Sequence, residues 1–169
     1  MTTGRGPEYG LQPNASGTLA VKFVDAVIPR SNLMSATGIV QHPIHLGRGG
    51  TAVVEPDFTG AIDWYQHYTE RHASDGTEGR LVSMFTFTSS WDMWEMHPHG
   101  SEIVLCTFGM LILHQETADG ERRTICLSPG EYAINEAGTW HTADVPTSAT
   151  AIFITAGWGT EHRPRSRSG

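Results

Sequence analysis

Cysteine is scarce in this sequence of 169 residues, which contains only Cys106 and Cys126. Each cysteine lies in an apolar, strand-like run, where a free thiol packs as a small hydrophobe more often than it forms a bridge. We therefore expect no structural disulfide. A chain of this length can instead fold on an ordinary apolar core.

Basic residues are also few. The chain has 11 Lys plus Arg against 18 Asp plus Glu, giving a net charge of −7, and Lys22 is the sole lysine. This acidic balance argues against a broad nucleic-acid surface. Long apolar runs are missing too: stretches such as 103–107 and 151–154 are far shorter than the ~20 residues that cross a bilayer. The polar N-terminus, residues 1–19, has no apolar signal segment. We expect a cytoplasmic protein with neither membrane nor nucleic acid as a partner.

Turn-forming residues are abundant, with 19 Gly and 9 Pro, and charged residues make up only 17%. This mixture excludes a coiled coil and disfavours a helical bundle or a disordered chain. Short runs rich in β-branched and aromatic residues alternate with Gly, Pro and Asp turn signals, which predicts an antiparallel sandwich or barrel. The expected strands are 80–88, 102–108, 110–115, 122–127, 131–135 and 149–155.

The rest of the chain organises around this barrel. Residues 1–18 are interpreted as a flexible N-terminal arm and residues 161–169 as a solvated basic tail. A single domain spans 19–160, with its core barrel at about 80–156. The sequence of residues 19–56 predicts short strands and loops, with a turn at 47–50. Apolar residues recur near the helical period between 58 and 72, so this segment is expected to be the one helix.

Two clusters carry the residue types that bind metals. The first, residues 94–102, contains Glu95, His97, His99 and Glu102 and runs directly into a strand; the second, residues 130–141, ends at His141. Imidazole and carboxylate groups gathered from separate strands are what a divalent transition metal requires.

The paired clusters resemble the two motifs of the cupin family. In that family the first motif runs Gly-x5-His-x-His-x3 or 4-Glu-x6-Gly and the second Gly-x5-Pro-x-Gly-x2-His-x3-Asn. Here His97-x4-Glu102-x6-Gly109 is similar to the end of the first motif. Gly130-x5-Glu136-x-Gly138-x2-His141 is similar to the second, with Glu136 in the place of Pro and Val145 in the place of Asn. The resemblance implies an all-β fold, a double-stranded β-helix (cupin or jelly-roll barrel), with an N-terminal arm and one short helix.

The resemblance also implies a ligand set. His97, Glu102 and His141 take the family's metal-binding positions, and Glu95 occupies the place of its first histidine. Glu95 is then either a fourth ligand or a catalytic general base. His99 is the alternate ligand, in a register where it pairs with His97 but leaves only two residues before Glu102.

A cupin of this kind implies a divalent transition metal, with Fe or Mn favoured by the mixed carboxylate and imidazole set and Ni, Zn or Cu also open. The function expected is a metal-dependent small-molecule enzyme, an oxidoreductase of the dioxygenase type or an isomerase or lyase. The alternative is a non-catalytic small-molecule-binding cupin with a degenerate metal site. Aromatic rings near the motifs are candidates for the wall of a substrate pocket or for core packing: Trp91, Trp94 and Trp140.

Two further expectations concern the remaining histidines and the assembly. Five other histidines are expected at the surface or in supporting positions, since they lie in a loop-like segment, on the polar side or end of the helix, or at a strand end: His42, His45, His67, His72 and His114. A homodimer is expected, in which the N-terminal arm adds a strand to a partner's sheet edge.

Overall fold

A computed structural model describes residues 35–166 of the chain. The chain divides into two units, residues 1–36 and 37–169, and the fold below belongs to the second unit. The expected arm, residues 1–18, lies outside the described residues, as does the part of the expected tail beyond residue 166.

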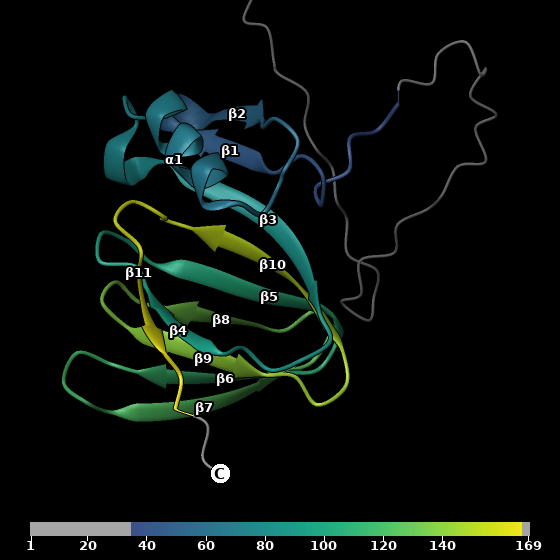
Figure 1. The fold of residues 1–169 in the computed structure, drawn as a ribbon, viewed down its shortest axis with the longest axis vertical. Coiled ribbons are helices and arrows are strands. Elements are labelled where there is room, and N and C mark those ends of the chain that lie inside the picture. The colour runs from purple at the N-terminus through teal and green to yellow at the C-terminus, as the bar shows by residue number, and fades with distance from the viewer. Residues whose placement is uncertain (1–34, 167–169) are drawn as a thin grey trace, which may run out of the picture. The chain divides into compact units, whose positions relative to one another are not determined.

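Two antiparallel sheets form this unit (Figure 1). The first contains, in order, β2 (Thr51–Val54), β1 (Ile44–Gly47), β3 (Arg80–Phe87), β10 (Ala149–Thr155), β5 (Glu102–Gly109) and β8 (Tyr132–Asn135). The second contains β11 (Glu161–Pro164), β4 (Met93–Met96), β9 (Trp140–Asp144), β6 (Leu111–Glu116) and β7 (Arg122–Leu127).

The strand order identifies the architecture. From β3 to β10 the chain builds β3-β10-β5-β8 in one sheet and β4-β9-β6-β7 in the other. Because consecutive strands repeatedly change sheet, the two sheets wind together as a double-stranded β-helix, the jelly-roll arrangement. The predicted fold class, all-β with one helix of substantial length among the described residues, is confirmed.

Side-chain alternation explains how the barrel is filled. Along β5, Glu102, Val104 and Cys106 are buried, while Ile103 and Leu105 are only partly buried. Successive side chains of a strand face opposite sides, so one parity supplies the interior. The apolar core consists of Val104, Cys106, Leu111, Leu113, Leu127, Ala133, Ala143, Val145, Ala149, Ala151 and Phe153. Polar members of the same inward parity, Glu102 on β5 and His141 on β9, mark where the core gives way to a candidate site.

The helix is shorter than the segment predicted from its periodicity. Helix α1 spans Ile62–Arg71, and Trp64 is its buried residue. Phe58 precedes the helix and packs its ring edge-on against Trp64 at a centroid distance of 4.9 Å. Ile62, by contrast, is 79% exposed. The aromatic contact rather than the simple apolar stripe therefore decides which face of α1 is covered. The turn expected at 47–50 is confirmed as the 3-10 turn η2 (Arg48–Gly50) between β1 and β2.

Residues 161–164 require a correction, because they form β11, paired with β4, and not part of a solvated tail. The Arg163 guanidinium lies over the rings of Trp94 and Trp140, at 5.1 and 4.4 Å from their centroids. Arg165 Nη2 lies 2.8 Å from Asp144 Oδ1. These contacts attach the segment to the sheet, although its charged, proline-containing composition alone would favour a solvated tail.

Both cysteines are free, Cys106 buried in the core and Cys126 exposed on β7, as expected from the sequence. Within residues 35–166, no helix is long and apolar enough to cross a membrane.

Candidate metal centre

Four of the predicted site residues meet inside the barrel. Glu95 on β4 and His141 on β9 are paired across the second sheet, so their side chains leave the same face. His97 follows the end of β4, and Glu102 opens β5 in the opposite sheet. The jelly-roll winding thus brings together groups that are 46 positions apart at most along the sequence, from Glu95 to His141.

The distances between these groups are short. His97 Nε2 lies 3.4 Å from Glu102 Oε1, and His141 Nε2 lies 3.0 Å from Glu102 Oε2. Glu95, His97 and His141 each place one ligand atom within 4.8 Å of the others. Among the described residues, neither Nε2 has a partner in hydrogen-bond geometry although both are fully buried. Two unpartnered imidazole nitrogens facing carboxylates fit a divalent cation, which would satisfy all of them.

Each imidazole is oriented by its other ring nitrogen. His97 Nδ1 lies 2.9 Å from Thr160 Oγ1, and His141 Nδ1 lies 3.3 Å from the Thr139 carbonyl oxygen. Such outer contacts fix the rotation of a metal-binding imidazole and direct its remaining nitrogen inward. Here they direct both Nε2 atoms toward Glu102.

Glu102 is held by donors on both carboxylate oxygens. Thr155 Oγ1 donates to Oε1 at 2.7 Å, and Asn135 Nδ2 donates to Oε2 at 3.0 Å. Gln115 Nε2 in turn donates to Asn135 Oδ1 at 2.7 Å. Each oxygen keeps a further lone pair, so the carboxylate is fixed in place and can still bind a cation.

The electrostatics of the site are strongly coupled. Burial by itself raises the pKa of Glu102, but His141 and His97 oppose it and bring the pKa well below its usual range. Burial by itself lowers the pKa of His141, whereas the Glu102 carboxylate raises it, with a net rise. The pair therefore favours an ionised carboxylate, the form that a metal requires, together with a protonated His141 that must lose its Nε2 proton when a metal binds.

Glu95 differs from the other three residues because its side chain is 32% exposed and lies at the rim of the group. Its Oε1 is 3.4 Å from His162 Nε2 on β11, and this contact is the main cause of a raised His162 pKa. Burial, followed by the charge of Glu95, raises the pKa of Tyr65 on α1 to about 12. Glu95 therefore faces both the two histidines of the centre and groups closer to solvent.

Sequence reasoning missed Thr160 and His162, because both lie at or beyond the boundary drawn for the tail. Recognising 161–164 as a strand beside β4 would have placed His162 opposite Glu95. The outer partners Asn135, Thr155 and Gln115 carried no distinguishing pattern in the sequence.

His99, the alternate ligand, is exposed and does not belong to the group that gathers around Glu102. The two ligand registers considered from the sequence, one without His99 and one with it, therefore predict different positions, and His99 lies outside the group. The arrangement described above is that of His97, Glu102 and His141, with Glu95 beside them.

The three tryptophans occupy different surroundings. Trp91 lies beside the centre, 6.3 Å from the His141 ring, and also packs on Phe87 and Phe153. Trp94 and Trp140 do not face the centre, since they neighbour Glu95 and His141 in sequence and so leave the opposite face of the sheet. Their rings pack on Arg163 instead. Of the three expected pocket aromatics, Trp91 alone adjoins the site.

Comparison with known proteins gives similarity to solved structures only. No protein-family model matches the chain, and a search of curated proteins finds no similar sequence. Oxalate oxidase is similar at 16% identity and a TM-score of 0.42, over 48% of this chain and 44% of that one. Hydroquinone 1,2-dioxygenase from Sphingomonas sp. TTNP3 is similar at 15% identity and a TM-score of 0.40, over 45% and 59%. A cupin superfamily protein from Desulfitobacterium hafniense DCB-2 is similar at 18% identity and a TM-score of 0.39, over 45% and 65%.

Each match spans less than two thirds of the solved chain. The strand order and the motifs carry the assignment of the fold. The sheets β3-β10-β5-β8 and β4-β9-β6-β7 form a jelly roll, and both His/Glu motifs meet inside it. The chain therefore has the double-stranded β-helix fold of the cupin proteins.

Proposed function

We propose that this protein is a mononuclear metal-dependent enzyme that acts on a small molecule, with oxidation of the dioxygenase type as the reaction its site suits best. The observation that carries the proposal is the pair of buried, unpartnered nitrogens, His97 Nε2 and His141 Nε2, facing the Glu102 carboxylate. Two imidazoles and one carboxylate on one side of a metal resemble the donor set of non-haem Fe(II) oxygenases.

His97, Glu102 and His141 would hold the metal, and their outer partners keep them in position. When bound, an Fe or Mn ion supplies Lewis acidity and positions open to exogenous ligands. The proposal includes isomerase and lyase reactions, because these need the metal ion only as a Lewis acid.

Glu95 is the residue best placed to move a proton. Its partial exposure lets it reach a substrate at the rim, and His162 at 3.4 Å can hold the carboxylate in a fixed orientation. If Glu95 instead completes the metal shell, the site has two carboxylates and favours Fe(II) or Mn(II) over Ni(II) and Cu(II). Glu95→His should then raise the Ni(II) to Mn(II) affinity ratio, whereas a Glu95 that acts only as a proton acceptor predicts an unchanged ratio in competition titrations.

Trp91 supports a pocket for a flat or apolar substrate. Its ring lies beside His141 and continues into the aromatic cluster formed with Phe87 and Phe153. An aromatic surface next to a metal excludes water from one side of the site and packs against planar carbon groups.

The experiment that tests the proposal compares His141→Gln with His99→Gln. Both changes remove one imidazole, but His99 is exposed and outside the group, so it serves as the matched control. Full-length protein purified without a metal-chelating tag is titrated anaerobically with Fe(II) and Mn(II). His141→Gln should lower affinity at least tenfold, and His99→Gln should leave it unchanged.

Nitric oxide added to the Fe(II)-loaded wild type tests whether positions remain open for an oxygen-like ligand. The expected result is the EPR signal of a high-spin ferrous nitrosyl complex. Equal loss of metal in both variants would contradict the ligand set. A wild type that binds neither Fe(II) nor Mn(II) would overturn the proposal in favour of a non-catalytic binding protein with a degenerate site.

A further inference from the structure

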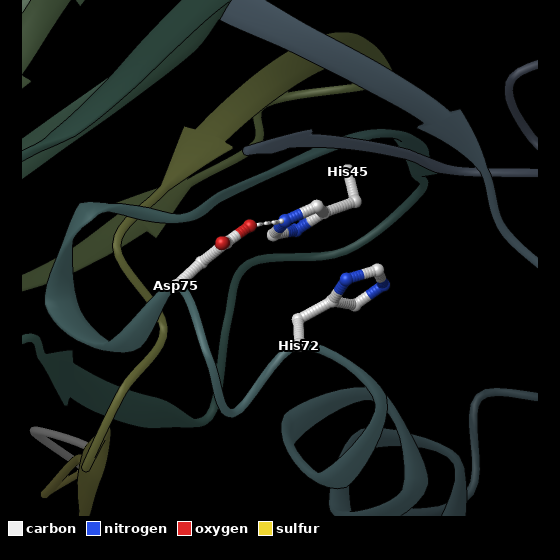
Figure 2. A group of neighbouring side chains, drawn as sticks. All are labelled: His45, His72 and Asp75. Carbon is white, nitrogen blue, oxygen red and sulfur yellow. Dashed lines mark hydrogen bonds and ion pairs between the residues drawn. The ribbon is translucent and has the colours of Figure 1, made fainter. Parts of the chain in front are cut away.

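A second group of metal-binding residue types lies outside the barrel interior. It consists of His45 on β1, His72 at the C-terminal end of α1, and Asp75 just before the 3-10 turn η3 (Gly76–Glu78) (Figure 2). Each offers one ligand atom within 4.8 Å of the others. His45 and His72 were expected at the surface or in supporting positions, and His45 is not at the surface, since it is 2% exposed.

Local structure explains why these three residues meet. β1 pairs with β3, which places His45 opposite Leu81, and α1 lies beside β1 (Figure 1). α1 ends at Arg71, and the chain then turns tightly, with the Asp75 amide donating to the His72 carbonyl at 3.0 Å. This turn presents His72 and Asp75, three residues apart, toward the His45 ring. Two ligands on one short loop and a third on a strand are a common way to build a metal site.

The nitrogens not facing the group have firm outer partners. His45 Nδ1 lies 2.8 Å from Tyr68 Oη, and His72 Nε2 lies 2.6 Å from Glu55 Oε1. Glu55 is itself buried and receives Arg71 Nη2 and Nε at 2.6 and 3.2 Å on its other oxygen. A carboxylate behind a histidine is the support that metal-binding imidazoles normally have.

These outer contacts decide which donor atoms remain. His45 Nε2 points to Asp75 Oδ2 at 2.8 Å, and the second nitrogen of His72, Nδ1, is turned toward the same place (Figure 2). A cavity of about 20 Å³ adjoins them, lined by His45, Tyr68 and His72 among others. This space accommodates about one water molecule.

We propose that His45 Nε2, His72 Nδ1 and an Asp75 oxygen bind a divalent transition-metal ion such as Zn(II), with a water in the adjoining cavity as fourth ligand. Two nitrogens, one carboxylate oxygen and one water suit the tetrahedral preference of Zn(II). This inference is independent of the barrel centre, since it shares no residue with it.

Ion binding changes a defined set of contacts. In the structure the His45 and His72 rings are stacked, with centroids 3.5 Å apart and an interplanar angle of 14°. An imidazole binds a metal in its own ring plane, so the ion must replace the His45–Asp75 hydrogen bond and tilt the rings out of the stack. His72 and Asp75 lie in the turn after α1 and are partly exposed, which lets their side chains make this adjustment.

The site would join β1, the end of α1 and the turn before η3. Because an ion that binds only the folded chain stabilises it in proportion to its concentration over its Kd, Zn(II) should raise the melting temperature. The role expected for the ion is therefore to fix α1 against the sheet.

The test uses the full-length chain carrying His141→Gln, which removes a ligand of the barrel centre. Into this background Asp75→Asn or Asp57→Asn is introduced. Asp57 is the matched control, because it also neighbours a histidine, His42, at 3.3 Å but is 86% exposed and outside the group. Zn(II) titration against a chromophoric chelator, together with the melting temperature, should show one high-affinity ion per chain. Asp75→Asn should weaken it at least tenfold and abolish the thermal shift, and Asp57→Asn should do neither.

His72→Gln provides a second variant, chosen over a change at buried His45 because the His72 side chain is 15% exposed. His72→Gln should also weaken Zn(II) binding at least tenfold. Far-UV circular dichroism verifies that each variant is folded. No Zn(II) binding by the folded His141→Gln chain, or equal binding by the Asp75 and Asp57 variants, would overturn the inference. Failure of the barrel proposal would look different, as unchanged Fe(II) affinity when His141→Gln is compared with wild type.

Discussion

Gly109 shows how a single motif position follows from backbone geometry. It joins β5 to β6 at φ +72°, and a Cβ added there would lie 2.0 Å from the Ser148 carbonyl oxygen. Both the left-handed backbone and the close approach of another strand exclude a side chain. The glycine that closes the first motif is therefore a requirement of the barrel corner.

We predict that Gly109→Ala destabilises the protein by about 3 kcal/mol or more, since backbone strain and steric overlap add. Gly138→Ala is the control: its φ is +79°, but no atom lies within 4 Å of the added Cβ. Strain alone should cost it about 1 kcal/mol. Urea unfolding of the two variants measures the difference, and equal destabilisation would contradict the steric explanation.

The residues that gather inside the barrel were predictable where spacing and chemistry coincide. His97, Glu102 and His141 follow from motif spacing, and Glu95 follows from its place in the first motif. Thr160, His162 and Asn135 could not be predicted, because hydroxyl, amide and terminal imidazole groups are common everywhere in a chain. Their significance arises only from the strands that bring them beside the ligands.

At the scale of elements, β11 is the main difference between the predicted and the observed structure. Composition favours a solvated tail for 161–169, and local sequence contains no alternation strong enough to predict a strand. The pairing depends on partners far away in sequence: Trp94, Trp140 and Asp144. Tertiary contacts thus override local preference in this segment. The start of α1 at Ile62 rather than Phe58 has a local cause, because Gly60 adopts φ +72°, outside the helical region.

We predict that Arg163→Ala releases β11. The change removes the guanidinium from two tryptophan faces and from Glu116 Oε1 at 3.1 Å, a loss of about 1 to 2 kcal/mol. Hydrogen exchange of the β11 amides should become markedly faster, while amides of β5 and β10 remain protected.

Arg123→Ala is the matched control for this change, because Arg123 pairs with Glu121 at 2.6 Å on exposed β7. Arg123→Ala should change the free energy of unfolding by no more than about 0.5 kcal/mol, as for most surface ion pairs. Unchanged β11 exchange in Arg163→Ala would show that backbone pairing with β4 suffices to hold the strand.

At the scale of the whole molecule, the jelly roll was predictable because its turns are marked in the sequence. Gly120, Gly130 and Gly138 all adopt positive φ at the predicted turns, and the strands between them fix the winding. The outer group of His45, His72 and Asp75 was not predictable. It depends on how α1 packs beside β1, where the Tyr68 ring lies edge-on to the His45 ring at a centroid distance of 5.6 Å.

The expected homodimer remains a prediction for the assembled protein. Among the described strands, β2 pairs with β1 alone, which leaves one edge open, and Val53 and Val54 on it are 45% and 58% exposed. An unpaired edge with apolar side chains favours strand addition by a second copy. Light scattering should give a dimer at micromolar concentration and a monomer for Val54→Glu. A monomeric wild type would contradict the prediction.

The central claim is that His97, Glu102 and His141 bind one metal inside the barrel, and anomalous X-ray scattering from crystals grown with Fe(II) or Mn(II) tests it most directly. Data collected on both sides of the metal absorption edge locate the ion independently of any assumed ligand. We predict one strong anomalous peak about 2.1 Å from His97 Nε2, His141 Nε2 and a Glu102 oxygen. No peak at that position, or a peak whose ligands include His99 in place of His97, would contradict it.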